Sequence, residues 1–527
     1  MKLNRKALVL AAALAAAGSF AFAQGSSESA GSKTTQAAGP VHVTLWYPAT
    51  QTEVGPLPND WAGYQIIKDK FNIELEAQTL PSGTQDQDVK IQAAAAADDL
   101  PDMFTAGREV WLRLASNGML ADVTDLYARM PNRTQLMFDE GAKKYTTLNG
   151  RNYGFATPAA VSRNEGLVIR KDWLDKLGLE VPKTTDDLLK VLHAFTYDDP
   201  DGNGKKDTYG YGAFVETNNY EAYPGRRLEP LMGAFGVEGT WNMTKENFGL
   251  NIHKPEFYDF MVFLKKQVID QGLIDPNWMA YKKDDFRGAW KQGKFGCFRE
   301  QNAALTAMNN YAPFDANFPD GSFTIIDGPT GPTGKSSIGP AIRSLRIWAI
   351  SQRAMDQGKG DKIAEMFNWM SYGEGYRLVG WGREGIEYEM KDGIPVSKPG
   401  DQGFEGPVGQ TYTQMRNMAY NYASDDELKS IFPTYVTAVS HKTMSALDTL
   451  HEMQRHPWTD ATGEDSMPVP STDLKTYYEQ GLAEFLTGKR ELTKANWASF
   501  IKQLDQIGAT AWEEAGRVYA EQNNLLK

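Results

Sequence analysis

The amino-acid sequence predicts an α/β fold, and three observations carry this prediction. Short β-branched and aromatic runs alternate with segments whose apolar residues recur at helical spacing, as a parallel sheet with crossover helices requires. The chain has 527 residues, which is too long for one core and fits two or three domains. Hydrophobic residues make up 41% of the chain and include 13 Trp, so it can bury large cores.

The N-terminal part of this pattern is a βαβ unit. Residues 41–47, VHVTLWY, are β-branched and aromatic, end before Pro48 and predict a core strand. Residues 61–71 carry apolar side chains at helical spacing, and residues 73–77 alternate as a second strand. The alternation continues with a helix over 88–98, a strand over 100–104 and a helix over 108–117.

The later elements repeat the alternation. Thr184 and Asp187 form a capping box, in which hydroxyl and carboxylate bind free amides, before a helix over 188–195. Cys297 falls in a short apolar strand, which favours a buried, inert thiol over a nucleophile. The other predicted elements are strands at 153–158, 166–170 and 345–350, helices at 172–177, 251–272, 284–292 and 361–372, and a mostly helical region after residue 470.

Charge and cysteine content exclude several classes of protein. The chain carries 55 basic and 67 acidic residues, a net charge of −12, which argues against binding to nucleic acid or anionic lipid. A single cysteine excludes an intramolecular disulfide framework and any cysteine-based metal cluster.

The N-terminus has the parts of a signal peptide. A basic start precedes the apolar residues 7–18, and residues 21–23, AFA, form a small-x-small cleavage site. The apolar stretch is shorter than the roughly 20 residues that a membrane-spanning helix needs. We expect cleavage after Ala23 and a soluble periplasmic protein, because Gln24 stands where a lipoprotein carries cysteine. Residues 24–40 are small and polar and predict a disordered leader.

One loop has the spacing of a calcium site. Residues 199–207 read DPDGNGKKD, with oxygen-bearing side chains at loop positions one, three, five and nine and glycine at six. Position twelve is Gly210 rather than the bidentate Glu of an EF-hand, so Asp207 must supply more of the charge. The alternative is a turn that uses these side chains locally. The candidate ligands are Asp199, Asp201, Asn203, Lys205 through its carbonyl, and Asp207.

Catalytic motifs are weak in comparison. His451 and His456 are five residues apart, about 140° around a helix, so they do not share a metal. Paired carboxylates of a glycoside hydrolase remain an alternative, because 67 acidic residues give many chance pairs. Glu165, Glu300, Glu384 and Glu387 follow strands in loops, where they either bind sugar hydroxyls or pair with Arg163, Arg299 and Arg383. Trp278, Trp348 and Trp381 are candidate platforms for sugar rings, with core packing as the alternative.

A series of short segments resembles a known family. The segments are VTLWYP at 43–48, DLPDMF at 99–104, GMLADVTDLY at 118–127, RKDWLDKLGLEVPKTTDDLL at 170–189, FRGAWKQGKFGCF at 286–298, IDGPTGPTGK at 326–335, GREGIEYEM at 382–390 and FLTGKRELTKANWASFIKQLDQIG at 485–508. Their order resembles the bacterial extracellular solute-binding proteins of ABC transporters, especially the carbohydrate-binding group of alginate-binding proteins and LplA-type lipoproteins.

The resemblance implies a two-lobed periplasmic-binding-protein fold of type II, with a helical C-terminal region. A hinge is expected near residues 157–167 and 330–345. The expected lobes are residues 41–157 plus 330–400 and residues 158–329 plus 401–527. The resemblance also supports structural Ca²⁺ in the loop at 199–207. It places ligand contacts at Tyr47, Thr50, Thr105, Arg108, Glu109, Arg163, Glu165, Glu300 and Gln301, to which the sequence adds Trp278, Trp348, Trp381 and Arg383.

The expected function is a periplasmic substrate-binding protein that captures a sugar or oligosaccharide and delivers it to an ABC permease. It performs no covalent chemistry, binds no nucleic acid and acts as a monomer. A uronic-acid-bearing oligosaccharide is favoured, with Arg108 and Arg163 as carboxylate partners. Two alternatives remain open: an exported polysaccharide-cleaving enzyme, and a peptide or opine binder of the same fold with a charge clamp in the cleft.

Overall fold

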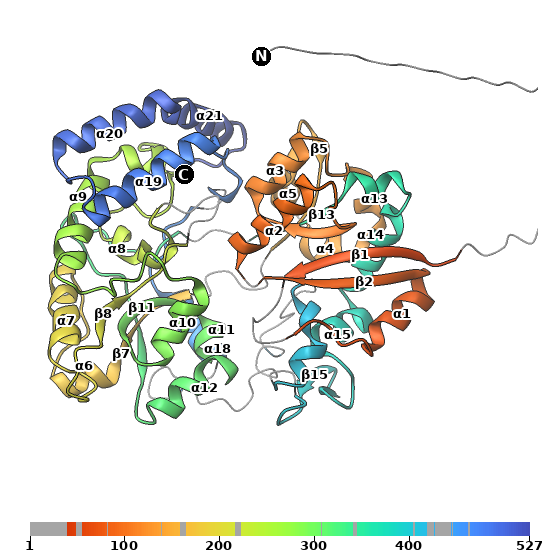
Figure 1. The fold of residues 1–527 in the computed structure, drawn as a ribbon, viewed down its shortest axis with the longest axis horizontal. Coiled ribbons are helices and arrows are strands. Elements are labelled where there is room, and N and C mark those ends of the chain that lie inside the picture. The colour runs from red at the N-terminus through yellow and green to blue at the C-terminus, as the bar shows by residue number, and fades with distance from the viewer. Residues whose placement is uncertain are drawn as a thin grey trace, which may run out of the picture. The chain divides into compact units, whose positions relative to one another are not determined.

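A computed structural model describes residues 39–48, 55–81, 83–138, 140–158, 165–216, 223–306, 308–340, 345–403, 406–418, 426, 444, 446–461 and 464–527. The predicted signal peptide and most of the predicted leader lie outside these residues. The chain divides into residues 1–39 and a unit of residues 40–527, and two main β-sheets organise this second unit (Figure 1).

The first sheet is mixed, with the strand order β2-β1-β3-β13-β6. β1 runs parallel to β2 and β3, as the βαβ pattern predicts, but β13 runs antiparallel to β3 and β6. The expected parallel sheet is therefore wrong for these last strands, because β13 enters after the chain returns from the second sheet rather than through a crossover helix. The strands are β1 (Val41–Pro48), β2 (Ile73–Leu80), β3 (Met103–Ala106), β6 (Phe155–Pro158) and β13 (Leu345–Ile350).

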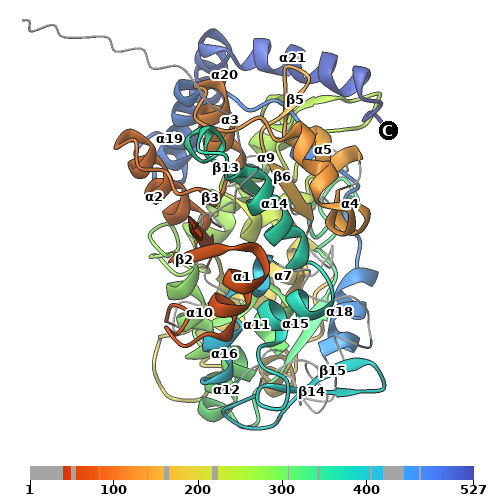
Figure 2. The ribbon, with the colours of Figure 1, turned by 90° about the vertical axis from the view of Figure 1, so that its right-hand side faces the viewer.

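Helices cover both faces of the first sheet, because successive strand residues point to opposite faces. Trp348 and Ile350 of β13 pack in a core with α1, α14 and α15. Ile347 and Ala349 of the same strand pack in another core with α2 and α3. Figure 2 shows α14 and α15 along the side of the sheet that faces the viewer. We call this sheet and its covering elements the first lobe.

The first lobe contains these further elements: α1 (Ala62–Phe71), α2 (Thr84–Ala96), α3 (Arg108–Ser116), η1 (Thr124–Arg129), α4 (Pro131–Met137), α5 (Glu140–Tyr145), β4 (Thr147–Leu148), β5 (Arg151–Asn152), α13 (Gln352–Asp356), α14 (Gly360–Trp369), α15 (Gly373–Trp381), β14 (Tyr388–Lys391), β15 (Ile394–Ser397), α16 (Gly409–Tyr412) and η5 (Gln414–Met418).

The second sheet has four strands in the order β12-β7-β11-β8. β11 runs antiparallel to β7 and parallel to β8. Leu167, Ile169 and Cys297 face the core with α6, α7 and α9, whereas Val168 and Phe298 face the core with α10 and α12. We call this sheet and its covering elements the second lobe. Its strands are β7 (Glu165–Arg170), β8 (Tyr209–Gly212), β11 (Phe295–Gln301) and β12 (Phe323–Ile326).

The second lobe contains these further elements: α6 (Lys171–Leu177), α7 (Thr185–Tyr197), η2 (Arg226–Leu228), α8 (Glu229–Gly233), β9 (Trp241–Asn242), β10 (Gly249–Leu250), η3 (Asn251–His253), α9 (Pro255–Phe263), the π-helical turn η4 (Leu264–Ile269), α10 (Lys283–Lys291), α11 (Asn302–Thr306), α12 (Met308–Asn317), α18 (Ala446–Arg455), η7 (Glu464–Ser466), α19 (Thr472–Thr487), α20 (Lys494–Ile507) and α21 (Ala509–Gln522).

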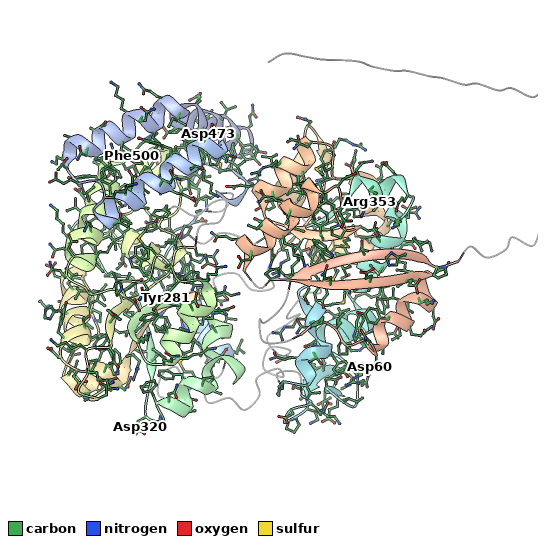
Figure 3. The ribbon with its side chains drawn as sticks, in the orientation of Figure 1. Asp60, Tyr281, Asp320, Arg353, Asp473 and Phe500 are labelled. Carbon is green, nitrogen blue, oxygen red and sulfur yellow. The ribbon has the colours of Figure 1, made fainter. Side chains whose placement is uncertain are left out.

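Several local predictions are confirmed. The Thr184–Asp187 capping box is present, with the Asp187 amide donating to Thr184 Oγ1 at 3.1 Å. Cys297 is fully buried, and burial raises the pKa of its thiol far above the ordinary value. The helical C-terminal region is formed by α19, α20 and α21, and Phe500, labelled in Figure 3, stacks on Tyr477 with ring centroids 5.4 Å apart. Among the described residues, no helix combines the length and apolar character that crossing a membrane requires.

The chain passes between the two lobes three times: from β6 to β7, from β12 to β13, and from η5 to α18. The second connection pairs with the segment that follows α18, because the Ile338 amide donates to the Pro457 carbonyl at 2.9 Å and the Thr459 amide to the Gly339 carbonyl at 3.0 Å. The β12–β13 connection is therefore held beside residues 457–459 of the second lobe.

Candidate functional site

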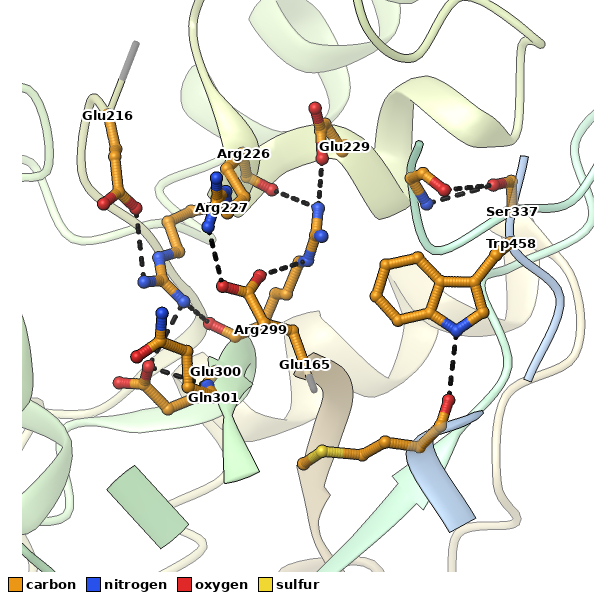
Figure 4. A network of polar contacts seen from close by, with 12 residues as sticks. Glu165, Glu216, Arg226, Arg227, Glu229, Arg299, Glu300, Gln301, Ser337 and Trp458 are labelled. Carbon is orange, nitrogen blue, oxygen red and sulfur yellow. Dashed lines mark hydrogen bonds and ion pairs between the residues drawn. The ribbon is translucent and has the colours of Figure 1, made fainter. Parts of the chain in front are cut away.

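Charged side chains gather at one end of the two central strands of the second sheet, where the first connection enters the sheet. β7 begins at Glu165 and β11 ends at Gln301, and their antiparallel register places these two residues opposite one another. The short helix η2 lies beside this end of the strands and adds two arginines. The cluster contains Glu165, Arg226, Arg227, Arg299, Glu300 and Gln301, drawn in Figure 4.

Glu165 is held by two guanidinium groups. Arg226 Nη1 donates to its Oε1 at 3.0 Å. Arg299 Nε lies 2.9 Å from its Oε2 as an ion pair without the geometry of a hydrogen bond. Arg299 also pairs with Glu229, and its Nη1 donates to the Arg226 carbonyl at 3.0 Å. Arg299 is therefore fixed between two carboxylates.

Glu300 is the second anchor of the cluster and is completely buried. Arg287 donates to both of its carboxylate oxygens at 3.1 Å, and Arg227 Nη1 donates to Oε1 at 3.3 Å. Arg227 Nη2 lies 3.2 Å from Oε2 of Glu216, on the far side of the guanidinium. The cluster thus couples η2 and α10 to the end of β11.

The charges of this network compensate one another. Burial on its own raises the pKa of the Glu165 carboxyl, but Arg226, Arg299 and Arg227 outweigh it and hold that pKa below its ordinary value. The pKa of Glu300 is likewise lowered, with burial opposed by Arg287 and Arg227. A general acid in glycoside hydrolysis needs a raised pKa, so neither carboxyl suits that role. The sequence left open whether these acids pair with arginines, and here they do.

The β12–β13 connection between the lobes lies against this network. Gly339 has φ +139, and a Cβ atom there would lie 2.6 Å from Glu229 Oε2 and 2.7 Å from Arg299 Nη1. Trp458 lies in the segment after α18 that pairs with this connection, and the Arg299 guanidinium is 5.4 Å from its ring centroid. The ion pairs of the second lobe therefore contact the β12–β13 connection and the segment paired with it.

The predicted contacts of the first lobe differ in their surroundings. Tyr47 and Thr105 are buried, and Thr105 Oγ1 donates to the Ile347 carbonyl at 2.9 Å within the sheet. Arg108 and Glu109 open α3 and contact the second lobe instead. Arg108 Nη1 donates to the Met467 carbonyl at 2.8 Å, and Glu109 Oε1 pairs with Lys475 at 2.7 Å.

The three predicted tryptophan platforms are buried. Trp348 and Trp381 have no exposed surface, and Trp278 is 3% exposed. Core packing accounts for Trp278 and Trp348, which belong to the hydrophobic cores of the second and first lobes. Arg383 pairs with Glu387 at 2.6 Å and lies 3.6 Å from the ring centroid of Tyr412, so it stabilises its own loop.

Two further predicted contacts, Thr50 and Arg163, lie outside the described residues. Arg226, Arg227 and Trp458 were not predicted from the sequence. The adjacent arginines Arg226 and Arg227 were a usable signal, because two neighbouring cations need acidic partners when they are buried. Trp458 had no signal of its own beyond its residue type.

The loop of residues 199–207 is closed by hydrogen bonds around Asn203. Asn203 Nδ2 donates to Asp201 Oδ2 at 2.8 Å and to Asp207 Oδ1 at 3.2 Å, and the Gly204 amide donates to Asp199 Oδ2 at 3.0 Å. Burial and the neighbouring carboxylates raise the pKa of Asp201. Among the residues that the structure describes, no three histidine, cysteine or acidic side chains are arranged to hold a metal ion.

A separate apolar pocket lies among the C-terminal helices. It is lined by Leu474, Tyr478, Leu504 and Trp512, among others, with Glu109 of the first lobe at its margin. Trp512 Nε1 donates to the Pro468 carbonyl at 2.6 Å. The pocket is distinct from the ion-pair network, with which its lining shares no residue.

The sequence and the fold are similar to those of known proteins. The chain is 27% identical over 343 residues to the polygalacturonan/rhamnogalacturonan-binding protein YtcQ of Bacillus subtilis (strain 168), covering 63% of this chain and 64% of YtcQ. The chain spans less than two thirds of the length of the curated relatives that it matches.

Two solved structures share the fold. The substrate-binding protein FusA of the S. pneumoniae ABC transporter, in complex with kestose, has a TM-score of 0.67 at 18% identity, covering 92% of this chain and 99% of FusA. The alginate-binding protein AlgQ2 without calcium has a TM-score of 0.68 at 16% identity, covering 91% of this chain and 97% of AlgQ2. The expected two-lobed, type II periplasmic-binding-protein fold is confirmed.

The family follows from the sequence itself. The model of the family described as bacterial extracellular solute-binding protein matches residues 60–370, more than half of the chain. This range contains the whole second sheet, its ion-pair network and most of the first sheet. The chain therefore belongs to the bacterial extracellular solute-binding proteins.

Proposed function

We propose that this protein binds an oligosaccharide between its two lobes and delivers it to the permease of an ABC importer. The observation that carries the proposal is the pair of α/β lobes joined by three connections. A network of ion pairs lies at the end of strands β7 and β11, beside these connections. The names of YtcQ and FusA support a glycan as the ligand class. A uronic-acid-bearing glycan remains the favoured type, with Arg108 near the lobe contact as its candidate partner.

Binding would shift a population of open and closed forms. Contacts such as Arg108 with the Met467 carbonyl and Asp86 with Lys282, at 3.0 Å, join the lobes in this structure. A ligand that touches both lobes favours the closed form by its differential affinity. No covalent step is proposed, since Glu165 and Glu300 are committed to arginine partners.

Packing suggests lobe boundaries that differ slightly from those expected. Residues 330–340 hydrogen-bond to the second lobe, through the Thr330 amide to the Lys183 carbonyl at 2.8 Å. Met415 and Met418 lie in the core of the first lobe. We therefore propose a first lobe of residues 41–158 and 345–418, and a second lobe of residues 165–340 and 446–527.

The cellular setting belongs to the same proposal. The family is described as extracellular, which supports export. The signal-peptide pattern supports cleavage after Ala23 and a monomeric periplasmic protein that docks on its permease. Its net charge of −12 disfavours a nucleic-acid partner.

Structural Ca²⁺ in the loop of residues 199–207 is a further part of the proposal. The donors are all oxygens, the ligand type that Ca²⁺ prefers, and three carboxylates surround Asn203. Asp199, Asp201, Asn203 and Asp207 would hold the ion with the Lys205 carbonyl, and its charge would offset the mutual repulsion of the acids. The EF-hand mutant named for FusA supports such a site in a protein of this fold.

The test is a thermal-shift screen of residues 24–527 against oligogalacturonides, fructo-oligosaccharides, alginate oligomers and peptides. A ligand that binds only the folded state raises the unfolding midpoint. We expect a shift with at least one glycan, which mass spectrometry recovers intact. Cleavage of the glycan would favour a hydrolase, and a shift with peptides alone would favour the peptide binder.

The same assay tests calcium. We expect Ca²⁺ to raise the midpoint and a chelator to reverse the rise. Asp201→Ala removes one ligand and should abolish the response, whereas Asp320→Ala, in an exposed loop elsewhere, should retain it. An equal response of both variants would reject the loop as the site.

A further inference from the structure

Trp458 differs from the other tryptophans of the chain. All 13 lie in the described part, and ten of them are buried. The partly exposed ones are Trp46, Trp458 and Trp512. Trp46 carries the Lys90 ammonium 4.5 Å from its ring centroid, and Trp512 packs edge-on against Trp241 at 5.0 Å. Trp458 alone among these three contacts the ion-pair network.

The ring of Trp458 is fixed in orientation by two contacts. Arg299 lies over one face, and the indole Nε1 donates to the Met453 carbonyl at 3.1 Å (Figure 4). Arg299 is itself held by Glu165 and Glu229, so it forms a rigid support. The indole is therefore held on one face and along its N–H edge, while the residue as a whole remains partly exposed.

Trp458 lies next to the β12–β13 connection between the lobes. The neighbouring Thr459 amide donates to Gly339 at 3.0 Å, and Thr459 Oγ1 contacts Ser337 Oγ at 2.8 Å. Gly339 and Ser337 belong to the chain segment that leads back to the first lobe. A ligand held between two lobes lies against the segments that join them, and Trp458 is the partly exposed tryptophan beside such a segment.

We propose that Trp458 is an aromatic platform on which one sugar ring of the ligand stacks, with Arg299 as the residue that positions it. The inference rests on the proposed function and adds the contact residue. Sugar rings have an apolar CH face that packs on an indole, while hydroxyl groups at the ring edge remain free to hydrogen-bond. A tryptophan that is already immobilised loses little conformational entropy when it binds.

The experiment compares ligand affinity in four variants by isothermal titration calorimetry with trigalacturonate and kestose. Trp458→Leu keeps apolar bulk without a flat face, and Trp458→Phe keeps a flat face without the N–H. Trp512→Leu is the matched control, because Trp512 is also partly exposed and bonded through Nε1. Arg299→Lys tests the support of the ring, and circular dichroism checks that each variant folds.

We expect Trp458→Leu to weaken binding by about tenfold or more, while Trp458→Phe stays within about threefold of the wild type. Arg299→Lys should fall between them, and Trp512→Leu should match the wild type. Equal affinity of Trp458→Leu and wild type overturns the platform while leaving the proposed function intact. Loss of binding in Trp512→Leu alone places the ring in the apolar pocket and also overturns it. Absence of binding by the wild type to every glycan of the screen rejects the proposed function, and the platform with it.

Discussion

Glu109 and Lys475 form an ion pair of 2.7 Å between segments that are 366 residues apart in the chain. Glu109 lies in the first turn of α3 in the first lobe, and Lys475 lies in the first turns of α19 in the second lobe. Both side chains are about one quarter exposed, at 23% and 28%. The pair therefore joins the two lobes at a place other than the three chain connections.

This contact should stabilise the closed arrangement. We expect Lys475→Gln to raise the radius of gyration of the ligand-free protein in small-angle X-ray scattering, because removal of the pair favours an open form. Affinity for the ligand should fall by less than about tenfold, since partly exposed pairs contribute little. Lys489→Gln, whose partner Glu484 lies on the same lobe, is the control. An unchanged radius in Lys475→Gln would show that this pair does not govern closure.

The buried Glu300 should dominate the stability of the second lobe. Glu300→Gln keeps the shape of the side chain but leaves the charges of Arg227 and Arg287 without their carboxylate. We expect a loss of about 3–5 kcal/mol in the free energy of unfolding, measured in urea, because an unpaired buried charge is costly. Glu389→Gln, which breaks an exposed pair in the β14–β15 hairpin, should change stability only slightly. Similar losses in both variants would contradict the role of burial.

Asp88 should make stability depend on pH. Its Oδ1 accepts the Gly107 amide at 2.8 Å, and burial raises the pKa of its carboxyl to about 6. The unfolded pKa is about 3.9, so the folded state binds the proton more tightly and loses stability as pH rises from about 4 to 6.

Asp88→Asn removes this titration and keeps an oxygen for the amide. We expect the variant to gain about 2–3 kcal/mol relative to the wild type between pH 4 and pH 7, in urea unfolding at each pH. A difference that stays constant with pH would show that Asp88 has an ordinary pKa.

Gly339 should tolerate no side chain. Gly339→Ala would press a methyl group against Glu229 and Arg299 and would force a left-handed backbone on alanine. We expect a loss of about 1–3 kcal/mol in stability, with the fold retained. Gly334→Ala is the matched control, because Gly334 also has a positive φ of +77 but no heavy atom within 4 Å of its Cβ position. The difference between the two variants isolates the clash, and equal effects would mean that backbone strain alone matters.

The sequence predicted elements better than their arrangement. The strand at 345–350 was located correctly, because β-branched and aromatic residues cluster there. Its antiparallel pairing was not predicted, because the direction of a strand depends on the side from which the chain enters the sheet. Here the chain enters from the second lobe. The expected long helix over 251–272 is instead η3, α9 and the π-helical turn η4, since Pro255 restarts the helix.

The site was predicted only in part for a related reason. Glu165 and Glu300 were identified, but their partners Arg226 and Arg227 lie 61 and 73 residues away from them, and no local pattern reports such distances. Burial of Trp348 also depends on distant helices, among them α14, whose Phe367 packs against its ring at 5.7 Å. Residue type alone therefore made Trp348 a candidate platform and left out Trp458, although Trp348 is buried and Trp458 is partly exposed.

The burial of Cys297 has a practical consequence for fluorescence labelling. Its thiol is the only one in the chain, and it is enclosed in β11 with a strongly raised pKa, so maleimide dyes should leave the folded native protein unmodified. Cysteines introduced at Val89 in α2 and Val518 in α21, which are 66% and 43% exposed, would then be the only reactive sites. A dye pair at these positions would convert lobe closure into an optical signal, which makes the protein a natural scaffold for a glycan biosensor.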